Sequence, residues 1–165
     1  MRSFTPSDLS NVELHGILLG SIGPRPIAFA STVNSEGVAN LSPFSYFNIF
    51  SANPPILIFS PARRGRDNTT KHSYENAKAH PEVVINIVDF SIVQQMSLSS
   101  TEYPEGANEF EKAGLTAIPS DMVKPPRVKE SLVQYECKVN DIVELVKEGG
   151  AGNLIICELV KIHVR

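Results

Sequence analysis

From about residue 27 the side chains follow the two-residue period of a β-strand, with successive residues on opposite faces. Between Ile27 and Val33, one face carries Ile, Phe, Ser and Val and the other carries Ala, Ala and Thr. The turn sequence NSEG follows, so residues 27–52 predict a hairpin. Pro54 and Pro55 end its second strand, and ILIFSP begins a third strand, which is apolar on both faces and therefore expected to be buried.

Three more strands are predicted in the rest of the chain. EVVINIV, at 82–88, is one buried strand, while residues 131–147 and 153–165 are two long strands with clear alternation. The glycine cluster EGGAG joins the last two and is interpreted as a hairpin turn rather than a phosphate loop. About six strands, with antiparallel neighbours in sequence, favour a β-barrel or sandwich over a parallel sheet.

Short helices are predicted around these strands. Thr5, Pro6 and Asp8 give a helix start near the N-terminus, and Asp67 or Asn68 is the expected cap of a helix that ends before Pro81. Residues 91–100 and 108–114 predict two further short helices, and the Pro-rich segment 119–131 predicts a surface excursion. The expected fold is thus mainly β with a few short peripheral helices.

Charge and hydropathy then narrow the function. A formal net charge of −3 and a pI near 5.8 argue against a nucleic-acid binder. No apolar run approaches the roughly 20 residues of a bilayer span, and no secretory signal pattern is present, so a cytoplasmic protein that does not bind membranes is expected. Cys137 and Cys157 lie inside apolar runs and are expected to be free, buried thiols.

The common catalytic motifs are missing from the sequence. It has no Walker loop, no G-x-G-x-x-G, no G-x-S-x-G and no H-E-x-x-H. Its four histidines, His15, His72, His80 and His163, have no metal-ligand spacing, so no metal site is expected. Acidic residues form no evident dyad. No catalytic side chain is therefore predicted, and a bound cofactor becomes the expected source of any chemistry.

A basic run marks the first candidate site. Arg63, Arg64, Arg66 and Lys71 fall within nine residues, where a strand passes into a predicted helix start. Unpaired N–H groups and the helix dipole stabilise an anion there, so a phosphate monoester is the expected ligand. The alternative is a solvated basic loop with Asp67 as an ordinary helix cap.

The preceding segment SPFSYFN suggests a ring site beside the phosphate site. It mixes serines and Asn48 with Phe44, Tyr46 and Phe47, a combination that can hold a flat heterocycle. The alternative is that these aromatic side chains belong to the core.

Four segments then carry a resemblance to a known family: GPRPIAFAST, NLSPFSYFNIFSANPPILIFSPARR, DNTTKH and NLIICELVKIHV. They resemble the flavin reductase-like proteins of the FMN-binding split-barrel superfamily, which includes flavoredoxins and the reductase components of two-component monooxygenases. The resemblance runs from about Leu14 to the end of the chain. It implies a six-stranded antiparallel split β-barrel that holds FMN noncovalently and works as a homodimer, with each flavin near the subunit interface.

The resemblance also implies a set of flavin-binding positions. The first strand would line the flavin, the next strand would meet the isoalloxazine or ribityl chain, and the basic loop would take the phosphate. The implied residues are, in that order, Ala30, Ser31 and Thr32; Ser45, Phe47 and Asn48; and Ser60, Arg63, Asn68, Thr69 and Lys71. His163 would approach the flavin or nicotinamide; the alternative is a surface residue at a strand end.

The implied activity is that of an NAD(P)H-dependent flavin reductase. Hydride would pass to the flavin, and electrons would then go to free flavin, a partner oxygenase or another acceptor, with FAD as the alternative flavin. Two other readings stay open: an FMN-containing electron carrier without a nicotinamide site, and a binder of another phosphorylated ring. Residues 1–165 are expected to form one domain. Since many relatives continue past the last strand, the sequence ending at Arg165 is either a naturally short form or a truncated fragment, and its strand-like ending favours the fragment.

Overall fold

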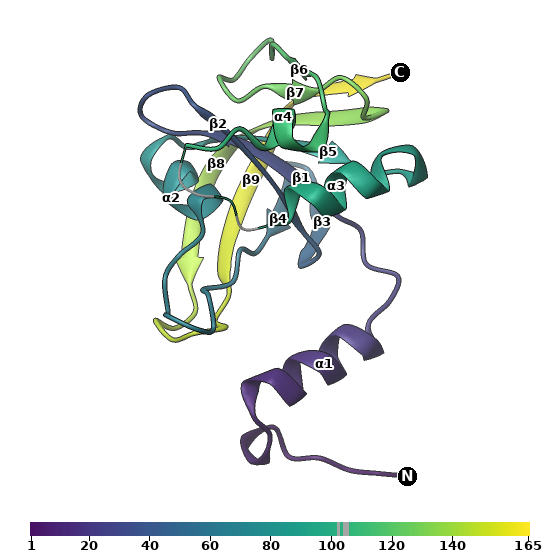
Figure 1. The fold of residues 1–165 in the computed structure, drawn as a ribbon, viewed down its shortest axis with the longest axis vertical. Coiled ribbons are helices and arrows are strands. Elements are labelled where there is room, and N and C mark those ends of the chain that lie inside the picture. Colours follow the sequence, from purple (N-terminus) through teal and green to yellow (C-terminus); the bar gives the residue numbers. More distant parts are fainter. Residues whose placement is uncertain (102, 104–105) are drawn as a thin grey trace.

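The computed structural model describes residues 1–101, 103 and 106–165. Seven strands form one antiparallel sheet in the order β2-β1-β5-β8-β9-β4-β3 (Figure 1). β6 and β7 form a separate two-stranded ribbon. The strand bounds are β1 Ala28–Val33, β2 Ala39–Phe44, β3 Phe47–Ala52, β4 Pro55–Phe59, β5 Glu82–Ile87, β6 Ala117–Ile118, β7 Arg127–Val128, β8 Val133–Glu144 and β9 Asn153–Val164.

The two outermost strands of this sheet are neighbours in sequence. β2 pairs with β1 at one edge of the sheet, and β3 pairs with β4 at the other edge. In the sequence, only Ser45 and Tyr46 separate β2 from β3. The sheet must therefore close on itself, which confirms the predicted split barrel. The predicted second strand of the hairpin is in fact two strands, β2 and β3, and this break accounts for the seven strands of the main sheet where six were expected.

The barrel interior is filled by the alternating side chains that the sequence pattern predicts. The largest fully buried side chains of this core are Phe59, Ile85 and Ile155, none of which has any exposed surface. A second cluster, around Phe29, Leu41 and Phe110, lies between the barrel and two of the helices. Cys137 and Cys157 are buried and free, as expected from their apolar surroundings.

The helices are short and lie around the barrel. They are η1 Pro6–Asp8, α1 Asn11–Ser21, α2 His72–Ala79, η2 Phe90–Ile92, α3 Val93–Ser99 and α4 Glu109–Ala113. α2 contacts β1 and β2, and α3 and α4 contact each other over β2 (Figure 1). None of the helices in the described ranges is long and apolar enough to cross a membrane.

Both predicted helix starts are wrong in position. Thr5 precedes only the 3-10 turn η1, whereas α1 is capped by Ser10, whose side chain accepts from the Glu13 N–H in a capping box. α2 begins after Lys71 rather than after Asp67 or Asn68. The reason is that Asn68 has a φ of 57°, in the left-handed region, so the chain forms a turn there instead of a helix.

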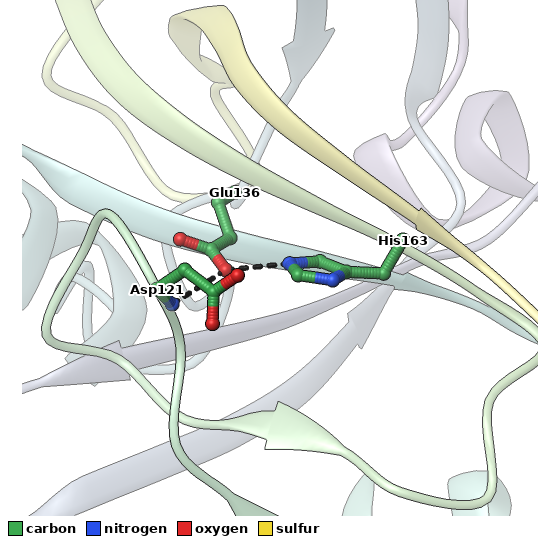
Figure 2. Close-up of side chains that lie close together, drawn as sticks. All are labelled: Asp121, Glu136 and His163. Carbon is green, nitrogen blue, oxygen red and sulfur yellow. Dashed lines mark hydrogen bonds and ion pairs between the residues drawn. The ribbon is translucent and has the colours of Figure 1, made fainter.

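The segment 119–131 is not a simple surface excursion as predicted. Val128 has no exposed surface, and its N–H donates to Asn86 Oδ1 at 2.8 Å. The segment is tied down at its start by Glu136, a fully buried carboxylate on β8 that accepts from the N–H groups of Asp121 at 2.8 Å and Met122 at 2.6 Å. Figure 2 shows the third partner, His163 of β9, whose Nε2 lies 2.7 Å from Glu136 Oε1.

Removing a core ring should destabilise the barrel. Phe59 is fully buried and its ring lies 5.4 Å from that of Phe44. We expect Phe59→Ala to lower the free energy of unfolding by about 3–5 kcal/mol through lost burial and the cavity left behind. Phe90→Ala is the matched control, because Phe90 is 93% exposed and its loss should change stability by less than about 0.5 kcal/mol. Urea unfolding followed by circular dichroism measures both, and equal effects would contradict this description of the core.

Glu136 should make stability depend on pH in the acid range. Burial by itself raises its pKa, but the N–H groups of Asp121 and Met122 and the ring of His163 outweigh burial and hold the pKa below its usual value. Because the unfolded pKa is higher, about 4.3, the stabilisation is present above that pH and is lost as pH falls through the folded pKa.

We therefore expect Glu136→Gln to cost about 1–3 kcal/mol at pH 7, since one acceptor of a buried network is lost. The variant should also lose less stability than the parent between pH 5 and pH 3. Urea midpoints at pH 7, 5 and 3 measure this, with Glu36→Gln on the exposed turn as the control. Parallel pH curves for parent and Glu136→Gln would rule out this role.

Candidate functional site

A cavity of about 950 Å³ opens beside the point where the barrel closes. Its walls come from α1, from β2 and Tyr46 at the β2–β3 junction, from residues 62–66, from the start of α2 and from the turn between β8 and β9. Ser99, Ser100, Thr101, Tyr103 and Glu109 complete it. The volume lies within the ~300–1,000 Å³ range of small-molecule sites.

All four residues of the basic run lie in the wall of this cavity: Arg63, Arg64, Arg66 and Lys71. The loop that carries them has a fixed shape, because its own side chains bind one another. Arg63 donates from Nε to Asn68 Oδ1 at 2.8 Å and from Nη2 to the Asn68 carbonyl at 2.7 Å. Arg64 Nη1 donates to Thr69 Oγ1 at 3.1 Å. Two of the four cationic groups, those of Arg63 and Arg64, are thus held in place before any ligand arrives.

Asp67 contributes to the same loop rather than to a helix cap. Its Oδ1 accepts from the N–H and the hydroxyl of Thr69, at 3.0 and 2.6 Å. These bonds, led by the Thr69 hydroxyl, lower the pKa of Asp67 to about 2. Asn68 and Thr69 were expected to bind phosphate, but they do not line the cavity and instead fix the conformation of the loop.

The glycine turn between β8 and β9 supports the basic loop from behind. Arg63 N–H donates to the Ala151 carbonyl at 2.8 Å, and Gly150 N–H donates to the Arg63 carbonyl at 3.0 Å. A Cβ on Gly149 would lie 3.2 Å from the backbone of Arg64 and Gly65, so a side chain there would press on the loop. EGGAG is a hairpin turn, as predicted, and its glycines also allow this close approach, which the sequence interpretation missed.

The aromatic segment divides at the barrel seam. Phe44 is in the core and Phe47 packs against it, so neither lines the cavity. Tyr46, between them, is 39% exposed and forms part of the cavity wall. Of the expected ring contacts, Ser45 is half-buried and Asn48 is exposed, and both lie outside the cavity wall. The signal for Tyr46 was present in SPFSYFN, but strand alternation did not reveal the break at this residue.

The expected contacts on β1 are inside the protein. Ala30, Ser31 and Thr32 have no exposed surface, and Thr32 Oγ1 accepts from Asn76 Nδ2 at 3.1 Å. The buried Ser31 hydroxyl has no hydrogen-bond partner among the described residues. Ser60 is also buried, and its hydroxyl would lie 2.7 Å from a Cβ on Gly152. None of these four residues lines the cavity.

Glu109 is a cavity residue that the sequence did not single out. The residue is 7% exposed, and its carboxylate accepts from Asn40 Nδ2 at 2.7 Å and from Leu41 N–H at 3.2 Å. Asn40 Oδ1 in turn accepts from the Ser73 hydroxyl at 2.7 Å. The network joins β2 to α2 and α4 and gives one cavity wall an anionic group. In the sequence, Glu109 looks only like an acidic residue in the first turn of a helix.

His163 lies away from the cavity. β9 leaves the cavity turn at Asn153, and His163 sits near the other end of that strand, against Glu136 (Figure 2). Donor atoms of Asp121, Glu136 and His163 lie within 4.8 Å of one another, close enough to hold a cation. However, Lys161 Nζ lies 3.3 Å from Asp121 Oδ2 and Arg127 Nε lies 3.9 Å from Glu136 Oε1. These two positive charges already balance the carboxylates and would repel a divalent ion.

Comparison with known proteins agrees with the fold. The flavin reductase like domain matches residues 20–165. An uncharacterized protein of Aquifex aeolicus is 40% identical over 136 residues, which cover 82% of this chain and 69% of that protein. An uncharacterized protein of Halalkalibacterium halodurans, BH2278, is 37% identical over 161 residues, covering 96% of this chain and 77% of that protein.

Two solved structures are similar over nearly the whole chain. Nitrilotriacetate monooxygenase component B from Bacillus cereus is 36% identical, with a TM-score of 0.93 over 99% of this chain and 81% of that one. The 2-nitrobenzoate 2-nitroreductase NbaA from Pseudomonas fluorescens is 28% identical, with a TM-score of 0.88 over 99% of this chain and 77% of that one. The chain therefore belongs to the flavin reductase-like family and has its split-barrel fold.

Proposed function

We propose that this chain binds FMN in the cavity and acts as an NAD(P)H-dependent flavin reductase, with FAD as the alternative flavin. The observation that carries the proposal is the preformed basic loop, which lies in one cavity wall while Tyr46 lies in another. A phosphorylated flat ligand needs both features, a cationic cradle and an aromatic contact.

The charge distribution supports a phosphate at the loop. The chain as a whole has a formal net charge of −3, yet Arg63, Arg64, Arg66 and Lys71 all line the same cavity. Two of these arginines are fixed by bonds to Asn68 and Thr69. Binding an anion therefore needs little further ordering of the loop, which lowers the entropic cost of association.

The protein's own side chains bind and orient rather than react. When bound, the flavin supplies the ring that accepts a hydride from NADH or NADPH. The carboxylate of Glu109, in the cavity wall, accepts hydrogen bonds from Asn40 Nδ2 and the Leu41 N–H, so it is held in a structural network. Burial raises the pKa of Cys137 to about 12 and raises that of Cys157 as well, so both thiols stay protonated at neutral pH and neither is a nucleophilic thiolate. The cavity walls, Tyr46 among them, would hold and orient the ring.

The acceptor is proposed from the relatives. Nitrilotriacetate monooxygenase component B is by its name one component of an oxygenase. We extend this to the present chain and propose that its electrons pass to free flavin, to a partner oxygenase or to a similar acceptor. The free thiols are consistent with a reducing, cytoplasmic location. The closed barrel supports treating residues 1–165 as one domain.

Flavin uptake and reduction test this function directly. The purified protein should take up FMN and show flavin absorption bands, and rapid mixing with NADH or NADPH should bleach them. FMN binding without bleaching by either nucleotide would favour the electron carrier instead. Absence of any FMN uptake on titration would overturn the proposal.

A variant of the basic loop supplies the matched control for this test. Lys71→Ala removes one cationic group from the cavity wall. It should weaken FMN binding by about 1.5–3 kcal/mol if the ammonium makes a charge-assisted bond to phosphate. Arg2→Ala removes the same charge from the exposed N-terminal segment and should leave FMN affinity unchanged.

We also propose that the protein is a homodimer. Ile49 and Phe50 are 63% and 62% exposed on β3, beside a break in its pairing with β4. Two adjacent large apolar side chains on an exposed strand favour a protein contact. Light scattering should give twice the chain mass of 18.0 kDa, and Phe50→Asp should shift the protein toward monomer. A parent protein that is monomeric at micromolar concentration would contradict the dimer.

A further inference from the structure

Helix α1 forms part of the cavity wall without being packed into the barrel. Asn11, Val12, Leu14, His15 and Leu18 line the cavity, but none of the eleven residues of α1 is buried. The extended segment 22–27 joins the helix to β1, and Figure 1 shows it set apart from the barrel. An isolated helix of this length is only marginally stable in water. Its position therefore depends on what it meets across the cavity.

Two contacts connect α1 to the opposite wall. Asn11 Nδ2 donates to the Gly149 carbonyl at 3.5 Å, at the outer limit of a hydrogen bond. The ring of His15 meets the ring of Tyr46 edge to face, with centroids 6.4 Å apart and an interplanar angle of 81°. Both rings are exposed and both line the cavity. One weak polar contact and one aromatic contact thus join the helix to the far side of the cavity.

The distance between the centroids of the His15 and Tyr46 rings is close to the distance needed for a flat ligand ring to stack between them. A flat ring that stacks on both sides needs neighbours about 7 Å apart, twice the ~3.5 Å contact distance between carbon atoms. From a centroid distance of 6.4 Å, a shift of less than about 1 Å and rotation of the His15 side chain would open such a slot. Because α1 has no buried residue, this shift would not disrupt any core packing.

The slot lies next to the basic loop. The Tyr46 carbonyl accepts from the Ser60 N–H at 2.9 Å, and Ser60 directly precedes the segment that carries Arg63 and Arg64. A ligand with a phosphate at one end and a flat ring at the other can therefore reach both the loop and the two rings within one cavity.

We propose that His15 and Tyr46 form a clamp that closes on the two faces of a phosphorylated heteroaromatic ligand, with α1 as its moving side. The inference rests on the proposed function, because the ring would be that of the flavin. It adds that α1, whose sequence shows no chemical motif, determines how tightly the ring is held.

Titration with two flavins separates the two ends of the site. Riboflavin has the same ring as FMN but no phosphate. We expect His15→Ala and Tyr46→Ala each to weaken FMN and riboflavin by the same factor, about 5-fold to 100-fold, the usual range for loss of one stacking contact. The double variant should lose less than the product of the two factors, because each ring needs the other to form the slot. His15→Phe should bind within about 3-fold of the parent, since it keeps an aromatic face.

Two controls distinguish a failed clamp from a failed function. Ile17→Ala changes a residue of α1 that does not line the cavity and should leave both affinities unchanged. Lys71→Ala should weaken FMN but not riboflavin. If the parent binds FMN and His15→Ala binds both flavins equally well, the clamp is wrong and the proposed function stands. If the parent binds neither flavin, both the proposed function and the clamp are wrong.

Hydrogen exchange on the unmodified protein gives a second measurement. Amide exchange over residues 11–21 should slow when FMN is added and should stay unchanged with inorganic phosphate alone, because only the ring engages α1. Exchange over this segment that is equally fast with and without bound FMN would overturn the proposal, whatever the variants show.

Discussion

Closure of the barrel at Ser45 and Tyr46 is the constraint on which the other features depend. Three Cα–Cα steps of 3.8 Å span at most roughly 11 Å, so β2 and β3 must meet although they lie at opposite ends of the strand order. The bond from Ser60 N–H to the Tyr46 carbonyl fixes the end of β4 at the same place. The aromatic residue of the cavity and the start of the basic loop are therefore adjacent because the barrel closes there.

The basic loop illustrates how like charges can be gathered at one place. Repulsion among four cationic side chains would favour an open, mobile loop. Here the loop supplies its own acceptors: the Asn68 amide and carbonyl bind Arg63, and the Asp67 carboxylate binds Thr69. The left-handed turn at Asn68 makes this arrangement possible. Of the residues expected at the phosphate, Asn68 and Thr69 bind Arg63 and Arg64 and so hold two side chains that line the cavity.

The sequence predicts the strands well and their junctions poorly. Alternation places β1, β8 and β9 correctly, and the apolar run of β5 marks a strand that is buried on both faces. The break between β2 and β3 at Tyr46 cannot be seen in the sequence pattern. No glycine marks a turn there, and apolar residues continue on both sides. The start of α1 was misjudged because Thr5 and Ser10 both precede an acidic residue by three positions, and only Ser10 forms the capping box. The basic run could be predicted as part of a binding site because its four cationic residues lie within nine positions of the sequence and therefore stay close together in the fold.

The position of His163 shows why residue type and strand assignment do not locate a side chain along a barrel. β8 and β9 form one long hairpin whose turn lies at the cavity, while His163 lies near its other end and pairs there with Glu136. The sequence did contain a sign of this second cluster. Glu136 interrupts the apolar run VQYECKV on a predicted strand, and a carboxylate buried there requires donors from elsewhere in the chain. His163 and the N–H groups of Asp121 and Met122 supply them, so the histidine serves to satisfy a buried charge.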